Sequence, residues 1–436
     1  MPDTIFALSS GLGRAGVAVV RVSGRAAGTV AEILSGKPLE PRKAVLTELR
    51  HSKTGDLIDR GLLLWFPGPA SFTGEDVAEF QVHGGRAVVA ALLDCLGRIS
   101  GLRAAEPGEF TRRAFENGKL DLTSVEGLSD LVAADTELQR RQALGQLSGA
   151  LRNVVYSWRQ RLIDSQALIE AHLDFPDESE IPVDITEEIE LELGLLRADL
   201  DQALAGRHQA EIVRDGGMVL LAGQPNSGKS SLLNRIASRD VAIISEIPGT
   251  TRDLLEVTID YRGLPITFVD SAGIRDDASD VIERIGINRT REKSTEANVV
   301  LWLSPADKAY SEPQLSHPNL WRVRSKADLI TSDDGDHAIS AVTGDGVTEL
   351  LDKVYNSLVA THAVLEPSLL VSRRQFSTVT IAYSAVSVAI DQLRLGRLEL
   401  VAEDLRRASE ALGELIGIIR VDDILDEVFG RFCLGK

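Results

Sequence analysis

Apolar residues in the first part of the chain occur in short runs that are bounded by glycine or turn residues. β-Branched and aromatic residues dominate these runs, which is typical of strands. Strands are predicted at residues 16–24, 61–67 and 77–82. The apolar spacing changes to a helical period at residues 26–34 and 86–99. We therefore expect residues 1–117 to form an α+β domain.

Two charged residues interrupt these apolar runs. Arg21 lies in the middle of the first predicted strand, and Glu79 lies in the third, shortly before His83. Either the two charges converge on a pocket, or they face solvent on the open side of an antiparallel sheet. The pattern by itself leaves both alternatives open.

Helical spacing dominates two further parts of the chain, residues 118–212 and residues 358–436. The first part contains a helical pattern with few breakers from Thr136 to Ile169, and Gly206 is placed to cap a later helix. Since an inserted domain usually has its termini close together, we predict one helical domain that is interrupted by an insertion.

The interrupting segment, residues 213–357, alternates strand patterns with helical patterns. Such βαβ alternation predicts a doubly wound α/β sheet. The candidate strands are Met218–Ala222, Ile266–Asp270, Val299–Leu303 and Leu320–Arg324. The expected fold class is therefore a multidomain α/β and α protein.

Composition narrows the class of protein. A chain of 436 residues is too long for one hydrophobic core, so we expect two to three domains. Contents of 44% hydrophobic and 26% charged residues are those of an ordinary globular protein. The net charge of −18 argues against a protein that grips nucleic acid over its whole surface, but it leaves room for a local basic patch.

The cysteines and the first residues indicate the compartment. Cys95 and Cys433 lie far apart without metal-ligand spacing, which suits a reducing environment. The first residues lack the basic segment and apolar core of a signal peptide, and no apolar run approaches the length that spans a bilayer. We therefore expect a cytoplasmic protein without a membrane partner.

A glycine-rich motif, GQPNSGKSS at residues 223–231, follows an apolar strand and opens a helix. The glycines allow backbone N–H groups to turn toward a phosphate. Lys229 is expected to reach the β- and γ-phosphates, and the Ser230 hydroxyl is expected to ligate Mg²⁺. The segment therefore predicts a P-loop that binds a nucleoside triphosphate.

Later motifs predict the base and the reaction. Asp270 and Gly273 follow a predicted strand, where the carboxylate can hold Mg²⁺ through water and the glycine N–H can meet the γ-phosphate. Thr251 lies in a loop that can close over Mg²⁺ when the γ-phosphate is present. Asp328 can accept hydrogen bonds from guanine N1–H and the 2-amino group, a donor pair that adenine lacks. This order of motifs predicts a GTPase.

Two positions depart from the usual GTPase pattern. Ser325 stands where an asparagine is common, so we expect weaker guanine binding or a looser loop. Ile274 follows the glycine in place of a water-positioning glutamine, so hydrolysis is slow or the water is oriented elsewhere. The residues predicted to contact GTP are Asn226, Ser227, Gly228, Lys229, Ser230, Ser231, Ser245, Glu246, Ile247, Pro248, Gly249, Thr250, Thr251, Asp270, Ser271, Ala272, Gly273, Ser325, Lys326, Ala327, Asp328, Ser340 and Ala341.

Further motifs are not explained by a GTPase alone. They are FPGP at 66–69, SFTGED at 71–76, HGG at 83–85, PGEFT at 107–111, NGKLDL at 117–122, PGTTRD at 248–253 and FCLGK at 432–436. Together with the P-loop they resemble the MnmE (TrmE) family of tRNA-modifying GTPases, and the resemblance covers essentially the whole chain.

The resemblance implies a tetrahydrofolate-binding and dimerising N-terminal domain, a split helical domain and an inserted Ras-like G domain. It implies that a formyl-tetrahydrofolate analogue binds at Arg21, Glu79, Lys119 and Lys436. The implied partner is the flavoprotein MnmG (GidA), which carries FAD and uses NADH. Together the two proteins would install a carboxymethylaminomethyl or aminomethyl group at C5 of the wobble uridine (U34) of certain tRNAs. The one-carbon unit would come from methylenetetrahydrofolate.

The resemblance also accounts for the missing glutamine. It implies activation by potassium and by pairing of the two G domains in a homodimer. The potassium ligands would be Asn226, Ser245, Ile247 and Thr250, and the ion would supply the charge that an arginine finger gives elsewhere.

The implied catalytic set contains Glu283, which matches the family's water-orienting acid, together with Thr251 and Gly273. Magnesium would be held by Ser230 and Thr251. For Cys433, in the terminal motif, a functional thiol and a structural thiol stay open as alternatives.

Two other functions compete with tRNA modification. A regulatory GTPase of ribosome assembly would be expected to carry a basic RNA-binding module, and none is evident in the sequence. A folate-dependent aminomethyl transferase that acts on protein or small molecules would have no need of a G domain.

Overall fold

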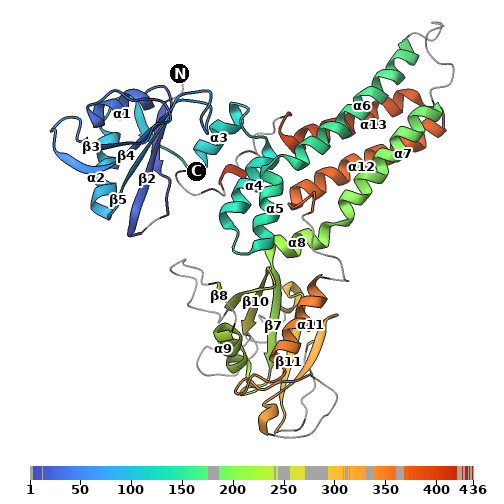
Figure 1. Cartoon of the computed structure of the whole chain (residues 1–436). Coiled ribbons are helices and arrows are strands. Elements are labelled where there is room, and N and C mark those ends of the chain that lie inside the picture. The colour runs from blue at the N-terminus through green and yellow to red at the C-terminus, as the bar shows by residue number, and fades with distance from the viewer. Residues whose placement is uncertain are drawn as a thin grey trace, which may run out of the picture. The chain divides into compact units, whose positions relative to one another are not determined.

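The computed structural model describes residues 3–11, 13–174, 186–239, 242–243, 256–270, 293–307, 309, 313, 315–329, 337–359, 368–419, 425, 428–430, 432 and 435 (Figure 1). Contacts divide the chain into two compact units. One comprises Met1–Ser129, Gln146–Gly194 and Ser384–Lys436, and the other comprises Asp130–Gly145 and Leu195–Tyr383. The boundaries fall inside helices, so the helical segments contribute to both units.

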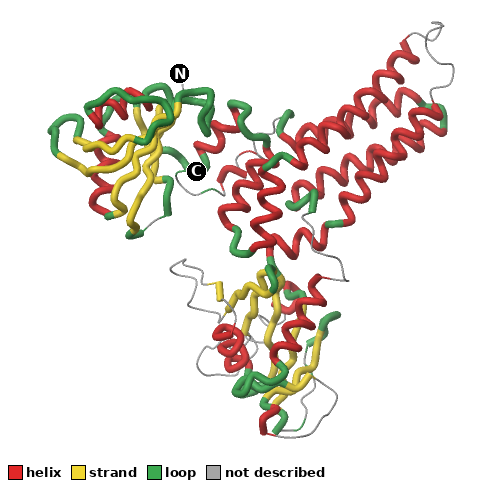
Figure 2. Tube along the Cα trace, viewed as in Figure 1, coloured by secondary structure: helices red, strands yellow, loops and turns green. Residues whose placement is uncertain are grey.

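The N-terminal sheet has six strands in the spatial order β3-β4-β5-β2-β1-β6. Strands are drawn in yellow and helices in red in Figure 2. The strands are β1 (Thr4–Leu8), β2 (Ala15–Ser23), β3 (Val45–Arg50), β4 (Leu57–Phe66), β5 (Val77–Gly84) and β6 (Leu102–Ala104). Neighbours pair antiparallel except β1 with β6, which pair parallel. The predicted strands are confirmed as β2, β4 and β5, whereas β1, β3 and β6 were not predicted.

Helices α1 (Ala27–Ser35) and α2 (Arg86–Gly97) pack on one face of this sheet (Figure 1). Val20 and Phe80 are fully buried in the core that they share. Because side chains alternate along a strand, Arg21 and Glu79 belong to the opposite face. On that face, Phe110 of α3 (Glu109–Glu116) packs against β1.

The nucleotide-domain sheet has seven strands in the order β13-β12-β11-β7-β10-β9-β8. They are β7 (Gly217–Gly223), β8 (Ala242–Ile243), β9 (Glu256–Tyr261), β10 (Leu264–Asp270), β11 (Val299–Pro305), β12 (Leu320–Ser325) and β13 (His337–Ala338). The four predicted strands are confirmed as β7, β10, β11 and β12. The sheet is mixed rather than purely parallel, because β9 pairs antiparallel with both β10 and β8.

Buried side chains cover both faces of this sheet, as a doubly wound arrangement requires. One face packs against α8 (Arg207–Asp215), α9 (Lys229–Arg239) and α11 (Val347–Val359). The carboxyl ends of β7, β10 and β12 therefore meet at one edge of the sheet, where ligands bind in open α/β folds.

The remaining long helices are α4 (Leu122–Ala133), α5 (Glu137–Leu147), α6 (Ala150–Asp174), α7 (Thr186–Ala205), α12 (Arg373–Arg394) and α13 (Leu398–Ile416). Helices α6 and α13, far apart in sequence, lie side by side (Figure 1). Within the described residues, we find no helix with the length and apolar character needed to cross a membrane.

Two helical predictions were wrong in detail. The pattern from Thr136 to Ile169 is not one helix, because Gly149 adopts a left-handed φ of 80° between α5 and α6. Gly206 directly follows the last residue of α7, as predicted, but its φ of −75° shows that it is not a left-handed cap. The last residues of the second predicted helical part, from 420 onward, lie largely outside the described residues.

Candidate functional site

The loop between β7 and α9 has the backbone geometry of a phosphate cradle. Gly223 has a φ of 144°, and a Cβ there would collide with the carbonyl oxygen of Leu303. Gly228 has a φ of 92°, and Asn226 has a left-handed φ of 62°, a region that asparagine tolerates better than most residues. The chain therefore turns sharply before the N-terminus of α9, whose free N–H groups favour an anion.

Two side chains in this loop are placed to contact a bound anion. The Lys229 side chain folds back, so that its Nζ donates to the carbonyl oxygens of Gly223 (2.9 Å) and Gln224 (3.1 Å). The Ser227 Oγ is buried and has no hydrogen-bond partner within the described residues. A buried hydroxyl without a partner costs about 1–3 kcal/mol, which a phosphate oxygen would offset. The loop therefore fits a phosphate group.

The oxygen ligands expected for magnesium lie together at the sheet edge. Ser230 Oγ donates a 2.7 Å hydrogen bond to Asp270 Oδ2. Asp270 ends β10 and is fully buried, so its carboxylate is fixed beside the P-loop. A hydroxyl and a carboxylate in contact suit Mg²⁺, which prefers oxygen ligands and keeps several waters.

The loop after β12 is tied both to the P-loop and to the following segment. Ser325 Oγ donates to the Ser227 carbonyl oxygen at 2.6 Å. Ser340 Oγ donates to Asp328 Oδ1 at 2.6 Å, which orients the exposed Asp328 carboxylate. Lys326 has a left-handed φ of 60° between them. The hydroxyl of Ser325 thus links the loop to the P-loop, in contrast to the looser loop that we expected without asparagine.

Other predicted positions lie outside the described residues. These are Ser245, Glu246, Ile247, Pro248, Gly249, Thr250, Thr251, Ser271, Ala272, Gly273, Glu283, Cys433 and Lys436. The predictions for the catalytic set, for most of the potassium ligands and for the terminal lysine therefore stay predictions.

A second site lies on the face of the N-terminal sheet opposite to α1 and α2. Arg21 and Glu79 are directly paired between β2 and β5, and the Arg21 guanidinium donates to Glu79 Oε1 at 2.8 and 3.0 Å. The Arg21 guanidinium lies 5.3 Å from the centroid of the Phe72 ring and 5.9 Å from that of Phe110. Phe110 is fully buried, whereas Phe72 is 37% exposed and can stack on a planar ligand.

Lys119, which follows α3, contacts the loop that carries Phe72. Its Nζ donates to the carbonyl oxygen of Pro69 at 3.0 Å. The chain terminus also reaches the N-terminal domain, because Ser9 Oγ donates to the Gly435 carbonyl oxygen at 2.9 Å. Three of the four residues that the resemblance implied for folate are thus described, and Arg21 and Glu79 are in contact.

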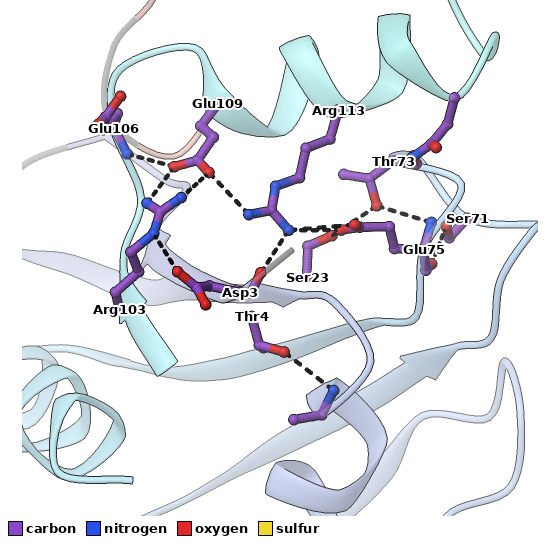
Figure 3. Close-up of polar contacts among 12 residues, drawn as sticks. Asp3, Thr4, Ser23, Ser71, Thr73, Glu75, Arg103, Glu106, Glu109 and Arg113 are labelled. Carbon is purple, nitrogen blue, oxygen red and sulfur yellow. Dashed lines mark hydrogen bonds and ion pairs between the residues drawn. The ribbon is translucent and has the colours of Figure 1, made fainter. Parts of the chain in front are cut away.

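A buried ion network holds the elements that carry this second site (Figure 3). The Arg113 guanidinium on α3 donates to Glu109 (2.9 Å), to Glu75 (3.0 Å) and to the carbonyl oxygen of Asp3 (2.8 Å). The Arg113 residue is only 7% exposed. Its charge therefore depends on these partners, because a buried cation without them is strongly unfavourable.

The network continues into β2 and into the loop that carries Phe72. Ser23 Oγ donates to Glu75 at 2.9 Å and lies 2.7 Å from Thr73 Oγ1 (Figure 3). Ser23 follows Arg21 on β2 by two residues, and Thr73 follows Phe72. The network thus fixes β2, this loop and α3 relative to one another.

Glu109 is the most strongly shifted acid of the network. Burial alone would raise its pKa, but hydrogen bonds from Arg103, the Glu106 backbone N–H and Arg113 outweigh burial and lower the pKa of Glu109 to about 2. The carboxylate therefore stays ionised and anchors the first turn of α3, where negative charge is favoured.

Comparisons with known proteins cover the whole chain. The MnmE helical domain model matches residues 122–433, and the GTP-binding protein TrmE N-terminus model matches residues 4–119. The tRNA modification GTPase MnmE of Rhodopseudomonas palustris is 46% identical over 441 residues, which cover 100% of this chain and 99% of the relative. The protein of the same name from Beijerinckia indica is 47% identical over 445 residues, which cover 100% of this chain and 96% of the relative.

The chain belongs to the MnmE family. The resemblance inferred from the motifs is thereby confirmed. A solved structure of Aquifex aeolicus Era matches 39% of this chain and 66% of its own at 23% identity with a TM-score of 0.26, which is too low to support an inference.

Sequence reasoning missed three residues that build the N-terminal site of this MnmE-family chain, namely Phe72, Phe110 and Arg113. Phe72 and Phe110 lie in motifs that contributed to the resemblance, so the motifs carried the signal without showing what the rings contact. Arg113 gave no signal, because an arginine at this position on an amphipathic helix looks like a solvated charge.

Proposed function

We propose that this chain is a GTPase that acts on the wobble uridine of certain tRNAs. Its MnmE-family relatives are named tRNA modification GTPases, which supports GTP hydrolysis and tRNA modification as its activity. The structural observation that carries the GTPase part is Asp328, oriented by Ser340, in a loop tied to the P-loop. An oriented carboxylate that accepts from N1–H and the 2-amino group selects guanine over adenine.

Different residues at the nucleotide site would contact the phosphates and the metal ion. Lys229 leaves the loop carbonyls to contact the phosphates, and the α9 N-terminus stabilises their negative charge. Ser230 and Asp270 would hold Mg²⁺, which neutralises charge on the phosphate oxygens when it is bound.

We further propose that potassium activates hydrolysis through Asn226, with Glu283 orienting the attacking water. The exposure of Asn226, which has a left-handed φ of 62° in the loop, supports this role, because its side chain is accessible to an ion. GTP turnover measured in potassium and in sodium at equal ionic strength tests the proposal. Equal rates in the two salts would exclude Asn226 as a ligand, and a Glu283→Ala variant that loses GTP binding would make Glu283 structural.

The N-terminal site is proposed to bind a tetrahydrofolate derivative. A half-exposed Phe72 ring offers a stacking surface for the planar pterin, and Glu79 offers a carboxylate that can accept from pterin N–H groups. This chain, acting together with the flavoprotein MnmG, would then transfer the methylene unit of the folate to the tRNA base. Lys119 and Lys436 complete the proposed pocket.

A homodimer formed by the N-terminal domains is part of the proposal. Leu46 on the edge strand β3 is 55% exposed and lies directly opposite Leu62 on β4, which is 38% exposed. An apolar pair at a sheet edge is a suitable surface for a second copy. We place the activity in the cytoplasm.

The decisive experiment is nucleoside analysis of wobble uridine in tRNA from cells that lack this protein. Loss of the C5 substituent, restored by the wild-type chain and not by a Lys229→Ala variant, is the expected result. Unchanged wobble nucleosides combined with a defect in ribosomal subunits would favour the ribosome-assembly alternative.

A further inference from the structure

One end of the N-terminal sheet carries a group of basic side chains, which we call the basic end: Arg14, Arg60, His83 and Arg86. Leu62 on β4 pairs with Gln81 on the antiparallel strand β5. Arg60 precedes Leu62 by two residues and His83 follows Gln81 by two, so both lie at the same end of the sheet. Ala15 pairs with Gly84, so Arg14 and Arg86 flank the same end of β2 and β5. All four residues of the basic end are exposed.

The arginines of the basic end have no acidic partner within ion-pair distance among the described residues. Within the described residues Arg14, Arg60 and Arg86 form no ion pair, whereas Arg50 pairs with Glu48, the residue opposite Arg60 on the neighbouring strand. The chain as a whole has a net charge of −18, so acidic groups are abundant. Arginines that stay unpaired in such a chain mark a place where an external anion is favoured.

His83 is held in one orientation at this end. Asp59 Oδ2 accepts from the His83 backbone N–H at 2.8 Å, and Asp59 Oδ1 lies 2.9 Å from His83 Nδ1. The His83 side chain is 71% exposed, whereas that of Asp59 is 12% exposed. A nearly buried carboxylate thus fixes an exposed imidazole, and the arrangement leaves Nε2 for a partner outside the chain.

Two members of the basic end, His83 and Arg60, lie on the same sheet face as the proposed folate pocket, whereas Arg86 begins α2 at the end of the sheet. Along β5, Glu79, Gln81 and His83 alternate with the buried Phe80 and Val82, so the three share the face opposite the core. Four residues of strand separate Glu79 from His83, which corresponds to about 13 Å. A ligand that starts at Arg21 and Glu79 can therefore extend along this face to the basic end.

We infer that the basic end binds the γ-linked glutamate carboxylates of a polyglutamylated folate. The inference rests on the proposed folate function, because it needs the pterin to lie at the pair formed by Arg21 and Glu79. A folate carries its negative charges at the far end of a p-aminobenzoyl spacer, and each added glutamate adds one carboxylate. Arginine forks and an oriented imidazole are the groups that bind such carboxylates.

The test compares the affinity of the full-length chain for 5-formyl-tetrahydrofolate with one glutamate and with three glutamates, measured by calorimetry. Two additional exposed carboxylates should tighten binding by about tenfold at low ionic strength, and added salt should reduce this preference. Arg60→Gln and Arg86→Gln should each reduce the preference while leaving the affinity for the monoglutamate and the thermal stability unchanged.

Lys37→Gln is the matched control, because Lys37 follows α1 on the other side of the sheet and loses the same charge. Its preference for the triglutamate should equal that of the wild type. His83→Gln should reduce the preference less than an arginine variant, since an imidazole offers one free ring nitrogen whereas a guanidinium binds a carboxylate through two N–H groups.

The possible failures are distinguishable. If the wild-type chain binds neither folate, the proposed folate function fails and the inference fails with it. If it binds both equally, the inference alone is overturned. Arginine variants that weaken tRNA binding at an unchanged triglutamate preference would assign the basic end to tRNA, and variants that shift the dimer equilibrium would assign it to a protein interface.

Discussion

The nucleotide site and the N-terminal site are built in different ways. The nucleotide site is mainly one continuous loop, residues 223–231, whose backbone torsions and helix N-terminus create the cradle. The N-terminal site takes Arg21, Phe72, Glu79 and Phe110 from separate segments and holds them through the buried charges around Arg113. A site of the first kind depends on backbone geometry, whereas one of the second kind depends on its supporting side chains.

The largest effect is expected where the supporting network is broken. Arg113→Met leaves Glu75 without its cation, and a buried charge that loses its partner costs about 3 kcal/mol. Thermal and denaturant unfolding should show a less stable N-terminal domain, while GTP affinity stays unchanged. Arg98→Met removes an exposed ion pair with Asp94 and should cost far less stability, because solvent screens an exposed pair. If both variants lost the same stability, the buried network would not be what supports the N-terminal site.

At the P-loop we expect the opposite result, namely weaker GTP binding with a smaller change in stability. Lys229→Ala removes the ammonium that would contact the phosphates, and loss of a charged hydrogen-bond donor should weaken GTP binding by roughly 100-fold. The unfolding transition should move less than in the Arg113 variant, since the Lys229 ammonium donates to the loop carbonyls of Gly223 and Gln224 rather than to a buried acid of the N-terminal network. Fluorescent-nucleotide titration measures the affinity. Lys293→Ala, which removes an exposed partner of Glu296, should leave the affinity intact.

A smaller effect tests how the two loops of the nucleotide site are joined. Ser325→Ala leaves the Ser227 carbonyl oxygen without its donor, so GTP affinity should fall roughly fivefold. Ser325→Asn keeps a donor and should leave the affinity unchanged or tighten it. Weaker binding by the asparagine variant would contradict our interpretation of this loop.

A further effect is a pH dependence confined to the N-terminal domain. The pKa of Glu109 is lowered to about 2 in the folded chain, from an unperturbed value of 4.5. Its contribution to stability is therefore fully present above pH 4.5 and disappears as the pH falls from 4.5 through about 2. Glu109→Gln should flatten the stability profile across this range, as measured by denaturant unfolding at each pH. Glu40→Gln, at an exposed ion pair, should keep the wild-type profile.

Local patterns predicted much of the architecture. The main strands of the nucleotide domain and β2, β4 and β5 follow from apolar runs between turn residues. The break at Gly149 was missed because a single glycine in a helical pattern does not reveal its φ. The strands β1, β3 and β6 were missed because short or polar strands become stable only through their neighbours.

The sequence by itself determined the P-loop, the order of the GTPase motifs and the family, because all of these depend on residues close together in the chain. Only the tertiary structure decided that Arg21 pairs with Glu79, that Ser325 contacts the P-loop and that Arg113 is buried. Each of these contacts joins segments that are far apart in the chain. Strand register and helix packing bring such side chains together, and the local sequence pattern does not predict the partner of a charged side chain.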